Sequence, residues 1–244
     1  MAQPTTDGDL GGLLCVFAHP DDEAYLAGAL MAVAADAGRR VVCVTATRGE
    51  LGFPDDDPRS IEERAALRTA ELDECLAILG VTEHVWLDHP DGGCADVPLD
   101  NPVGRLVEII DEVRPDHVLT FGPDGQTYHP DHIATGRWTT LACDRAEHDT
   151  RLLYATMTPE WANAFGKHVD LAEVMMVPDV EVPTVEPDEL SLWFVAEGDV
   201  LERKWQALRC QTSQTGGLIA LMGVDAYRRF LVDEFFRDPR PADW

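Results

Sequence analysis

Two predicted strands, each leading into a histidine-rich turn, constrain the fold of this chain most strongly. Leu13–Phe17 is continuously apolar, the pattern of a strand covered on both faces, and Asp116–Phe121 is a second predicted strand. Residues 19–23 (HPDDE) follow the first strand and residues 129–132 (HPDH) follow the second. Each turn opens a segment with helical spacing. In a parallel α/β sheet such turns lie at the carboxyl edge, so the two motifs are expected to meet in one pocket.

The remaining apolar pattern alternates between strand and helix. A helix over 22–37 and a strand over 40–46 complete a β-α-β unit, which implies parallel strands and a right-handed crossover. Ser60 and Glu63 have the spacing of a capping box, and Gly80 marks the end of the helix that follows it. Further strands are expected at 83–87, 152–157 and 191–195, and helices at 61–79, 102–113, 130–144, 201–210 and 225–236. The predicted fold class is α/β: a Rossmann-like, mostly parallel sheet with helices on both faces and a metal site at the carboxyl edge of the strands.

The length and composition of the chain suit a folded protein with one core. It has 244 residues, 45% of them hydrophobic, and no repeat, linker or low-complexity tract divides it. We therefore expect a single domain over 1–244, with residues 1–10 flexible and residues 150–244 extending the same domain. The N-terminus lacks the features of a signal peptide, and no apolar run reaches the roughly 18 residues of a membrane helix. A cytoplasmic protein without a membrane partner is expected.

The formal charge excludes some classes of partner. At a net charge of −26, the chain repels nucleic acid and anionic membrane surfaces, so neither is an expected partner. The six cysteines are scattered and form no C-x-x-C pair. They are predicted to be buried free thiols in a reducing compartment rather than a metal site.

The histidines and carboxylates of the two turns have the spacing of metal ligands. His19 and Asp22 are three residues apart, as are His129 and His132, and positions three apart share a face of a helix. A histidine and an aspartate from the first turn and one histidine from the second would make a three-ligand site with positions open for water and substrate, as in catalytic zinc sites. Zinc lowers the pKa of bound water to about 7 and polarises a carbonyl; Fe²⁺ or another divalent ion also suits these ligands.

Other groups in the same turns can move protons. Asp21, next to Asp22, can act as the base for a water molecule. The remaining histidine of the HPDH turn can donate to a developing oxyanion, and Asp131 can hold that histidine in the useful tautomer.

At these residues the chain resembles the LmbE-like, or PIG-L, family of zinc-dependent N-acetylglucosaminyl deacetylases. This family includes deacetylases and amidases of mycothiol and bacillithiol metabolism. The resemblance covers about the first 145 residues. It is carried by residues 18–23 (AHPDDE), 47–52 (TRGELG), 68–71 (RTAE), 79–81 (LGV), 91–92 (DG), 121–125 (FGPDG) and 129–132 (HPDH).

The resemblance implies a role for each matching residue. It implies that His19, Asp22 and His132 hold the metal. It implies that Asp21 is the general base and that His129 stabilises the oxyanion or protonates the leaving amine. Arg68 and Asp91 match positions that hold sugar hydroxyls, and Glu50 lies on a loop that lines the same pocket.

Two positions depart from the family pattern. Glycine often precedes the HPDH motif, whereas this chain has Tyr128. In the C-terminal motif K-x-x-A-x-x-x-H-x-S-Q, which here begins at Lys204, Gln211 stands where histidine is common. The catalytic set itself is intact.

The sequence therefore predicts a metal-dependent hydrolase, with zinc as the metal, that removes the N-acetyl group from a small molecule containing N-acetylglucosamine. Alternatives are an amidase that acts on a thiol S-conjugate or an antibiotic intermediate, and a non-catalytic metal- or sugar-binding protein. A nucleotide-binding oxidoreductase is disfavoured because its first turn should be rich in glycine, whereas this one carries carboxylates that would repel phosphates. The expected partner is an N-acetylated amino-sugar derivative, and a homo-oligomer is compatible with the family.

Overall fold

A seven-stranded sheet organises the part of the chain that the structure describes. The computed structural model describes residues 3–177 and 179–244; residue 178, and residues 1–2 of the segment expected to be flexible, lie outside this range. The strand order is β3-β2-β1-β4-β5-β7-β6. The strands are β1 Leu13–Phe17, β2 Val41–Thr45, β3 Glu83–Trp86, β4 His117–Phe121, β5 Arg151–Thr156, β6 Leu192–Val195 and β7 Asp233–Arg237.

The order of the strands reverses between β1 and β4. Strands β3, β2, β1, β4 and β5 are parallel neighbours, and Cys15 of β1 pairs with Cys43 of β2 on one side and Leu119 of β4 on the other. The chain thus winds from β1 outward to β3 and then returns to the opposite side of β1. Open α/β sheets bind ligands at the carboxyl ends of the strands where this reversal occurs. The predicted α/β fold, with a mostly parallel sheet, is confirmed.

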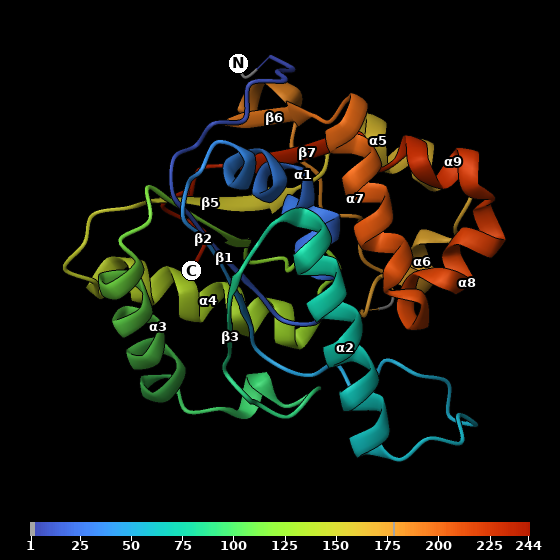
Figure 1. The fold of residues 1–244 in the computed structure, drawn as a ribbon, viewed down its shortest axis with the longest axis horizontal. Helices are drawn as coiled ribbons and strands as arrows, with labels where there is room; N and C mark the ends of the chain where they lie inside the picture. Colours follow the sequence, from blue (N-terminus) through green and yellow to red (C-terminus); the bar gives the residue numbers. More distant parts are fainter. Residues whose placement is uncertain (1–2, 178) are drawn as a thin grey trace.

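Helices cover both faces of the sheet (Figure 1). Helices α1, α2 and α7 lie on one face, whereas α3 and α4 lie on the other. Short helices α5, α6, α8 and α9 gather beside one end of the sheet. Their bounds are α1 Asp22–Asp36, α2 Ile61–Leu79, α3 Asp100–Val113, α4 Pro130–Arg145, α5 Pro159–Phe165, α6 Leu171–Val174, α7 Gly198–Cys210, α8 Thr212–Met222 and α9 Val224–Arg229, with 3₁₀ turns at Cys94–Asp96 and Pro187–Glu189.

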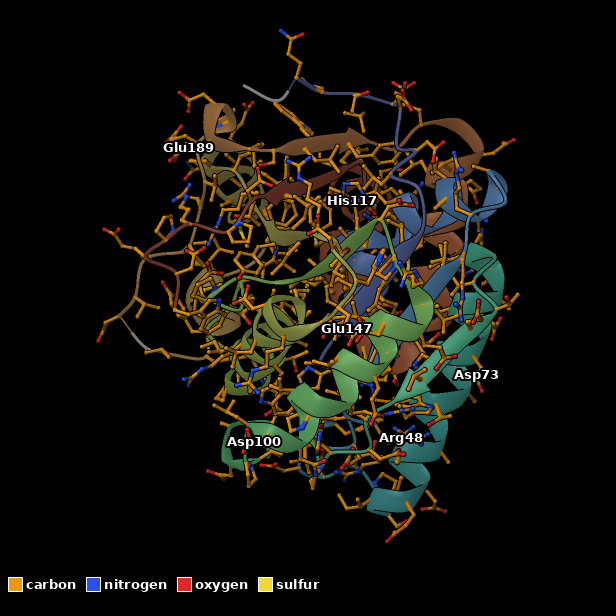
Figure 2. The ribbon with its side chains drawn as sticks, turned by 90° about the vertical axis from the view of Figure 1, so that its left-hand side faces the viewer. Arg48, Asp73, Asp100, His117, Glu147 and Glu189 are labelled. Atoms are coloured by element: carbon orange, nitrogen blue, oxygen red, sulfur yellow. The ribbon has the colours of Figure 1, made fainter. Side chains whose placement is uncertain are left out.

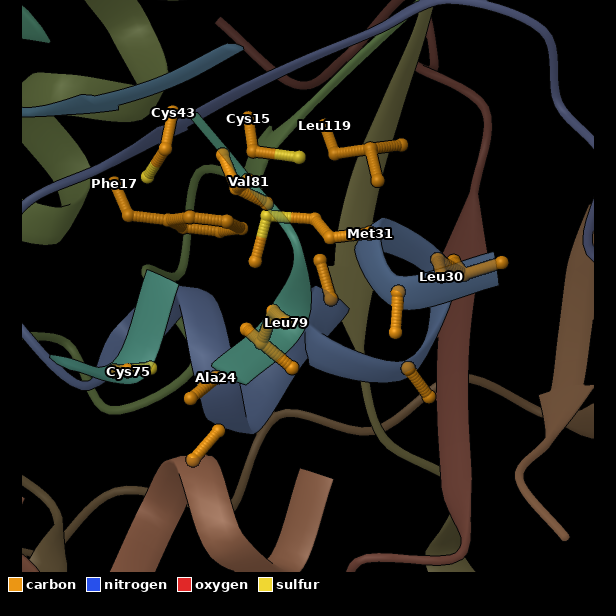
Figure 3. Close-up of a cluster of buried hydrophobic side chains, with 14 of the residues drawn as sticks. Cys15, Phe17, Ala24, Leu30, Met31, Cys43, Cys75, Leu79, Val81 and Leu119 are labelled. Carbon is orange, nitrogen blue, oxygen red and sulfur yellow. The ribbon is translucent and has the colours of Figure 1, made fainter. Parts of the chain in front are cut away.

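Alternation along β1 explains why both of its faces are apolar. Phe17 contributes to the core between the sheet and α1, whereas Val16 contributes to the core beneath α3 and α4. Figure 3 shows Phe17 and Leu119 of the strands close to Met31 of α1 and Leu79 of α2, all without exposed surface. The strand and helix on either side of the first histidine-rich turn are therefore fixed by close packing.

The start and end of α2 are as predicted. The hydroxyl of Ser60 accepts a hydrogen bond from the Glu63 amide at 3.2 Å, and the Glu63 carboxylate accepts one from the Ser60 amide at 2.8 Å. Gly80 ends the helix in the left-handed conformation, with φ 82°.

The helix predicted over 225–236 is confirmed only as far as Arg229, and the remainder of the prediction is wrong. Helix α9 ends at Arg229, and residues 233–237 form β7, which lies antiparallel between β5 and β6. Phe236 enters the core with α1 and α7, whereas Phe235 packs on Val185 and Leu190 in a separate cluster. Adjacent side chains that are buried on opposite faces require a strand. The sequence is also apolar at helical spacing, and only the pairing with β5 and β6 decides the outcome.

Acidic side chains are spread over the exterior. Figure 2 labels Asp73 of α2, Asp100 of α3, Glu147 after α4 and Glu189 of a 3₁₀ turn, all of them exposed. No helix in the described ranges is long and apolar enough to cross a membrane.

Candidate active site

The turn after β1 is held in a strained conformation. Asp21 precedes α1 with φ 110°, a region that residues other than glycine rarely adopt. The carboxylate of Glu23 accepts the Asp21 amide at 2.9 Å, and the Asp22 carboxylate accepts the His19 amide at 2.8 Å. Strained backbone of this kind persists where its surroundings over-determine it, and it is concentrated at functional sites.

The turn after β4 brings the second histidine motif to the same place. Gly125 has φ 56°, and a Cβ atom there would lie 2.8 Å from Cβ of His132, so glycine is required. The carbonyl of Gly125 accepts a hydrogen bond from Nδ1 of His132 at 2.9 Å. This bond places the proton on Nδ1 and leaves Nε2 of His132 as a bare lone pair.

The three predicted metal ligands converge. Nδ1 of His19 lies 3.1 Å from Nε2 of His132. The Asp22 carboxylate oxygens lie 3.6 Å from Nδ1 of His19 and 3.5 Å from Nε2 of His132. A tetrahedral zinc ion with ligand distances of about 2.0–2.1 Å separates its ligands by about 3.3–3.4 Å. The three donors therefore fit a divalent ion.

Two further carboxylates contact the other side of His19. Its Nε2 atom lies 3.1 Å from Asp91 and 3.4 Å from Asp131. His19, Asp91 and Asp131 offer a second group of candidate ligand atoms within 4.8 Å of one another, and His19, His129 and His132 offer a third. Asp91 and Asp131 are suited to accept the Nε2–H proton of His19, which would leave its Nδ1 free to bind an ion beside Asp22.

Asp91 and Asp131 are themselves held by backbone amides. Asp131 accepts the amides of Gly92 at 2.7 Å and Cys94 at 3.0 Å. Asp91 accepts the amide of Leu51 at 2.7 Å. These bonds orient both carboxylates toward His19.

The electrostatics of the cluster favour a cation. Burial alone would lower the pKa of His19, but the hydrogen bonds that its imidazole donates to Asp131 and Asp91 and the charge of Asp22 raise that pKa to about 10. Burial instead lowers the pKa of His132 to about 4, so this imidazole is neutral at pH 7. The carboxylates thus stabilise positive charge at their centre, which a divalent ion supplies as well as an imidazolium.

Arg68 holds Asp21 from inside the fold. It is only 3% exposed, and its guanidinium lies 3.3 Å from the Asp21 carboxylate and donates to the carbonyls of Gly49 and Pro20. Burial raises the pKa of Asp21 to about 7 although Arg68 opposes the shift. Arg68 is predicted to hold sugar hydroxyls. In the structure its guanidinium donates hydrogen bonds to backbone carbonyls and contacts the Asp21 carboxylate, so it is suited to position Asp21.

His129 is oriented by the backbone of Asp131. The Asp131 amide donates to Nδ1 of His129 at 3.1 Å, which places the imidazole proton on Nε2. The expected contact between the Asp131 carboxylate and His129 is replaced by the contact with His19. Burial and the proximity of His19 lower the pKa of His129, so it is a neutral donor.

Glu50 and Asp91, the other residues predicted to bind substrate, lie together. One Glu50 carboxylate oxygen accepts the Asp91 amide at 3.1 Å. The other is buried and has no hydrogen-bond partner among the residues that the structure describes. Since Asp91 also contacts His19, this pair lies directly against the ligand cluster, on the side of β2 and β3.

Glu23 has a structural role that the sequence does not indicate. Its buried carboxylate accepts Nε2–H of Gln211 at 2.7 Å and the thiol of Cys75 at 3.3 Å. Burial raises the pKa of Glu23. Gln211, the departure from the family histidine, thus supplies a donor to the carboxylate that holds Asp21. Tyr128, the other departure, has φ 58°, which explains why glycine suits this position.

A mainly apolar cavity of about 310 Å³ adjoins the cluster. Asp22 and His132 form part of its wall, and the rest comes mostly from residues after β4. Trp161, from α5, also lines it. The sequence could not indicate this cavity because α5, α6, α8 and α9 meet only in the folded chain.

Convergent imidazoles and carboxylates at the switch point of an α/β sheet have the features of a metallohydrolase site. Residues 14–143 match the PIG-L family, described as GlcNAc-PI de-N-acetylase. A relative from Acidothermus cellulolyticus, named 1D-myo-inositol 2-acetamido-2-deoxy-alpha-D-glucopyranoside deacetylase, is 36% identical over 91% of this chain and 87% of its own length. A protein of the same name from Mycobacterium sp. (strain JLS) is 33% identical over 83% of this chain and 73% of its own length. The chain belongs to the PIG-L family and is an amide hydrolase.

Solved structures share the fold. The N,N'-diacetylchitobiose deacetylase of Pyrococcus horikoshii matches with a TM-score of 0.62 and 21% identity over 96% of this chain and 86% of that one. A hydratase of Pseudomonas putida that acts on 4-carboxy-2-hydroxymuconate matches with a TM-score of 0.59 and 17% identity over 95% of this chain and 96% of that one. The same fold thus carries different reactions, and the activity must be argued from the site.

Replacing Arg68 tests its positioning role. In Arg68→Met, Asp21 loses its buried cation and two carbonyls lose their donor, so the free energy of unfolding should fall by about 3–5 kcal/mol. Arg105→Met is the control, because Arg105 pairs with Glu108 on the surface and its loss should cost about 0–1 kcal/mol. Urea unfolding followed by tryptophan fluorescence measures both. Equal losses in the two variants would contradict the role of Arg68.

Proposed function

We propose that this protein removes the N-acetyl group from a small molecule containing N-acetylglucosamine, with a divalent metal held by His19, Asp22 and His132. The observation that carries the proposal is the convergence of Nδ1 of His19 and Nε2 of His132, 3.1 Å apart, on the Asp22 carboxylate. Each imidazole has an acceptor for its other nitrogen, which directs both lone pairs to one point.

The metal would supply Lewis-acid chemistry: it lowers the pKa of water and polarises an amide carbonyl. Zinc suits two imidazoles and one carboxylate, and Fe²⁺ suits the same donors. The family resemblance favours zinc.

Asp21 is the proposed general base. It lies next to Asp22, and its raised pKa, about 7, suits a group that accepts a proton near neutral pH. It takes a proton from the attacking water, and that proton is later delivered to the leaving nitrogen. Water and the amide are thereby converted to acetate and a free amine.

His129 is the proposed donor to the reacting amide. Its neutral imidazole carries the proton on Nε2, and its ring centroid lies 4.7 Å from that of His19 and 4.8 Å from that of His132. A preorganised donor of this kind stabilises negative charge on the carbonyl oxygen as the tetrahedral state forms.

The names of the relatives support an amino-sugar substrate. The A. cellulolyticus relative is named for an inositol 2-acetamido-2-deoxyglucopyranoside, and the P. horikoshii enzyme is named for diacetylchitobiose. The common element is an N-acetylated glucosamine unit. We propose that this unit is what the present chain recognises.

Acetate release tests the proposed reaction. The purified protein should release acetate from at least one N-acetylglucosamine conjugate, including the inositol glycoside, and a chelator should abolish the release until zinc or Fe²⁺ is restored. Coupled enzymatic detection of acetate gives the rate. Release that persists unchanged at metal contents below about one-tenth of the protein would rule out the metal-dependent route.

Substitutions of the neighbouring residues Asp21 and Asp22 distinguish the proposed base from the proposed metal ligand. Asp21→Asn should keep its metal and lose about 10²- to 10⁴-fold in kcat, because the base no longer accepts a proton. Asp22→Asn should instead lose metal, since it removes a charged ligand. Metal analysis after gel filtration, together with acetate kinetics, distinguishes the two. Wild-type turnover in Asp21→Asn would refute its assignment as the base.

A further inference from the structure

The proposed metal ligands, His19, Asp22 and His132, lie between a charged region and an apolar one. His19 follows β1, which lies between β2 and β4 in the sheet. On the side of β2 and β3 the neighbouring groups are charged: Glu50 and Asp91 contact each other, and Arg48 pairs with Asp88 at 2.7 Å. On the side of β4, β5 and β7 lies the apolar cavity. A substrate amide at the cluster therefore has a polar environment on one side and an apolar one on the other.

Aromatic side chains build much of the cavity wall. The rings of Trp161 and Phe165 stack with centroids 5.0 Å apart, and Phe230 meets both edge-on at 5.5 and 5.1 Å. The hydroxyls of Tyr25 and Tyr227 bond each other at 2.7 Å, which occupies a hydrogen-bonding site on each. Trp161 and Phe165 lie in α5 and Tyr227 lies in α9, and both helices are at the right in Figure 1.

Away from the cluster, the cavity wall carries two acidic side chains, Asp233 and Glu234, and both have hydrogen-bond partners within the fold. The Asp233 carboxylate accepts Nε1–H of Trp193 at 2.7 Å. Glu234 is buried, and its carboxylate accepts Nζ of Lys204 at 2.8 Å and the amides of Ala29 and Leu30 at 2.7 and 3.0 Å. It therefore has little capacity left to bind a sugar hydroxyl. These walls are suited to hydrocarbon rather than to a carbohydrate.

The cavity is larger than an acetyl group needs. Its volume of about 310 Å³ lies at the lower end of the range for ligand pockets, about 300–1,000 Å³. A water molecule takes about 30 Å³ of liquid, and an acetyl methyl group is of similar size. An acetyl substrate would leave most of this apolar volume without a matching group.

We propose that the cavity receives the acyl chain of the substrate amide, so that the enzyme cleaves N-acylglucosamines with straight chains of four to eight carbons better than N-acetylglucosamine. This inference rests on the proposed amide hydrolysis. The sugar lies on the polar side, near Glu50 and Asp91, and the chain extends past His132 toward Trp161. Water adds to the carbonyl, the C–N bond breaks, and the products are the free carboxylic acid and the glucosamine amine.

Chain length provides the first test. The metal-loaded enzyme is assayed for amine release from N-acetyl-, N-butanoyl-, N-hexanoyl- and N-octanoylglucosamine. Each buried methylene should raise kcat/KM by roughly fourfold until the cavity is full. Hexanoate should also inhibit at lower concentration than acetate. A matched series of N-acetylglucosaminides with butyl, hexyl and octyl aglycones should show no such rise.

Two substitutions on α8 supply a matched pair. Leu218 lines the cavity, whereas Leu221 is 68% exposed on the same helix. Leu218→Trp should remove the preference for hexanoyl over acetyl, and Leu221→Trp should retain it. If Leu218→Trp does not fold, the wild-type chain-length series and the hexanoate inhibition still decide.

The outcomes are distinct for the two proposals. Cleavage of acetyl substrate with a flat or falling response to chain length overturns the acyl-chain assignment and leaves the proposed function standing. A rise in the aglycone series alone assigns the cavity to the aglycone and also overturns it. No amine release from any member of either series, with metal bound, overturns the proposed function itself.

Discussion

The imidazole of His19 is the contact on which the rest of the site depends. Its two nitrogens face different partners: Nδ1 faces Asp22 and His132, and Nε2 faces Asp91 and Asp131. Asp91, after β3, is held by an amide of the loop after β2, and Asp131, after β4, is held by amides of the loop after β3. The loops that follow four strands therefore meet at this one ring. The arrangement concentrates negative charge around a single cation position. Packing of β1 against α1 keeps the ring there.

Much of this site is predictable because it is local in sequence. The two histidine motifs each follow a strand, and the alternation of strands and helices predicts a parallel sheet in which the carboxyl ends of both strands lie at the same edge. The convergence of His19, Asp22 and His132 follows from β1 and β4 being neighbours. The capping box at Ser60 is equally local, since three residues define it.

What the sequence could not provide depends on contacts between distant segments. The burial of Arg68 against Asp21 depends on the packing of α2 beside the turn after β1, which the residues around Arg68 do not indicate. The side chain of Asp131 turns to His19 rather than to its own neighbour His129, because amides of the β3 loop hold it. The apolar spacing of β7 suits a helix as well as a strand, and only its pairing with β5 and β6 distinguishes the two. The apolar cavity likewise depends on contacts between distant segments, most of them in the C-terminal third of the chain.

Metal position is the most direct test of this account. Crystals soaked in zinc and measured at the zinc absorption edge would give an anomalous peak at the ion. The account predicts one peak within about 2.0–2.1 Å of Nδ1 of His19 and Nε2 of His132, next to the Asp22 carboxylate. A single peak at Nε2 of His19, between Asp91 and Asp131, would contradict it and would make these two carboxylates the ligands.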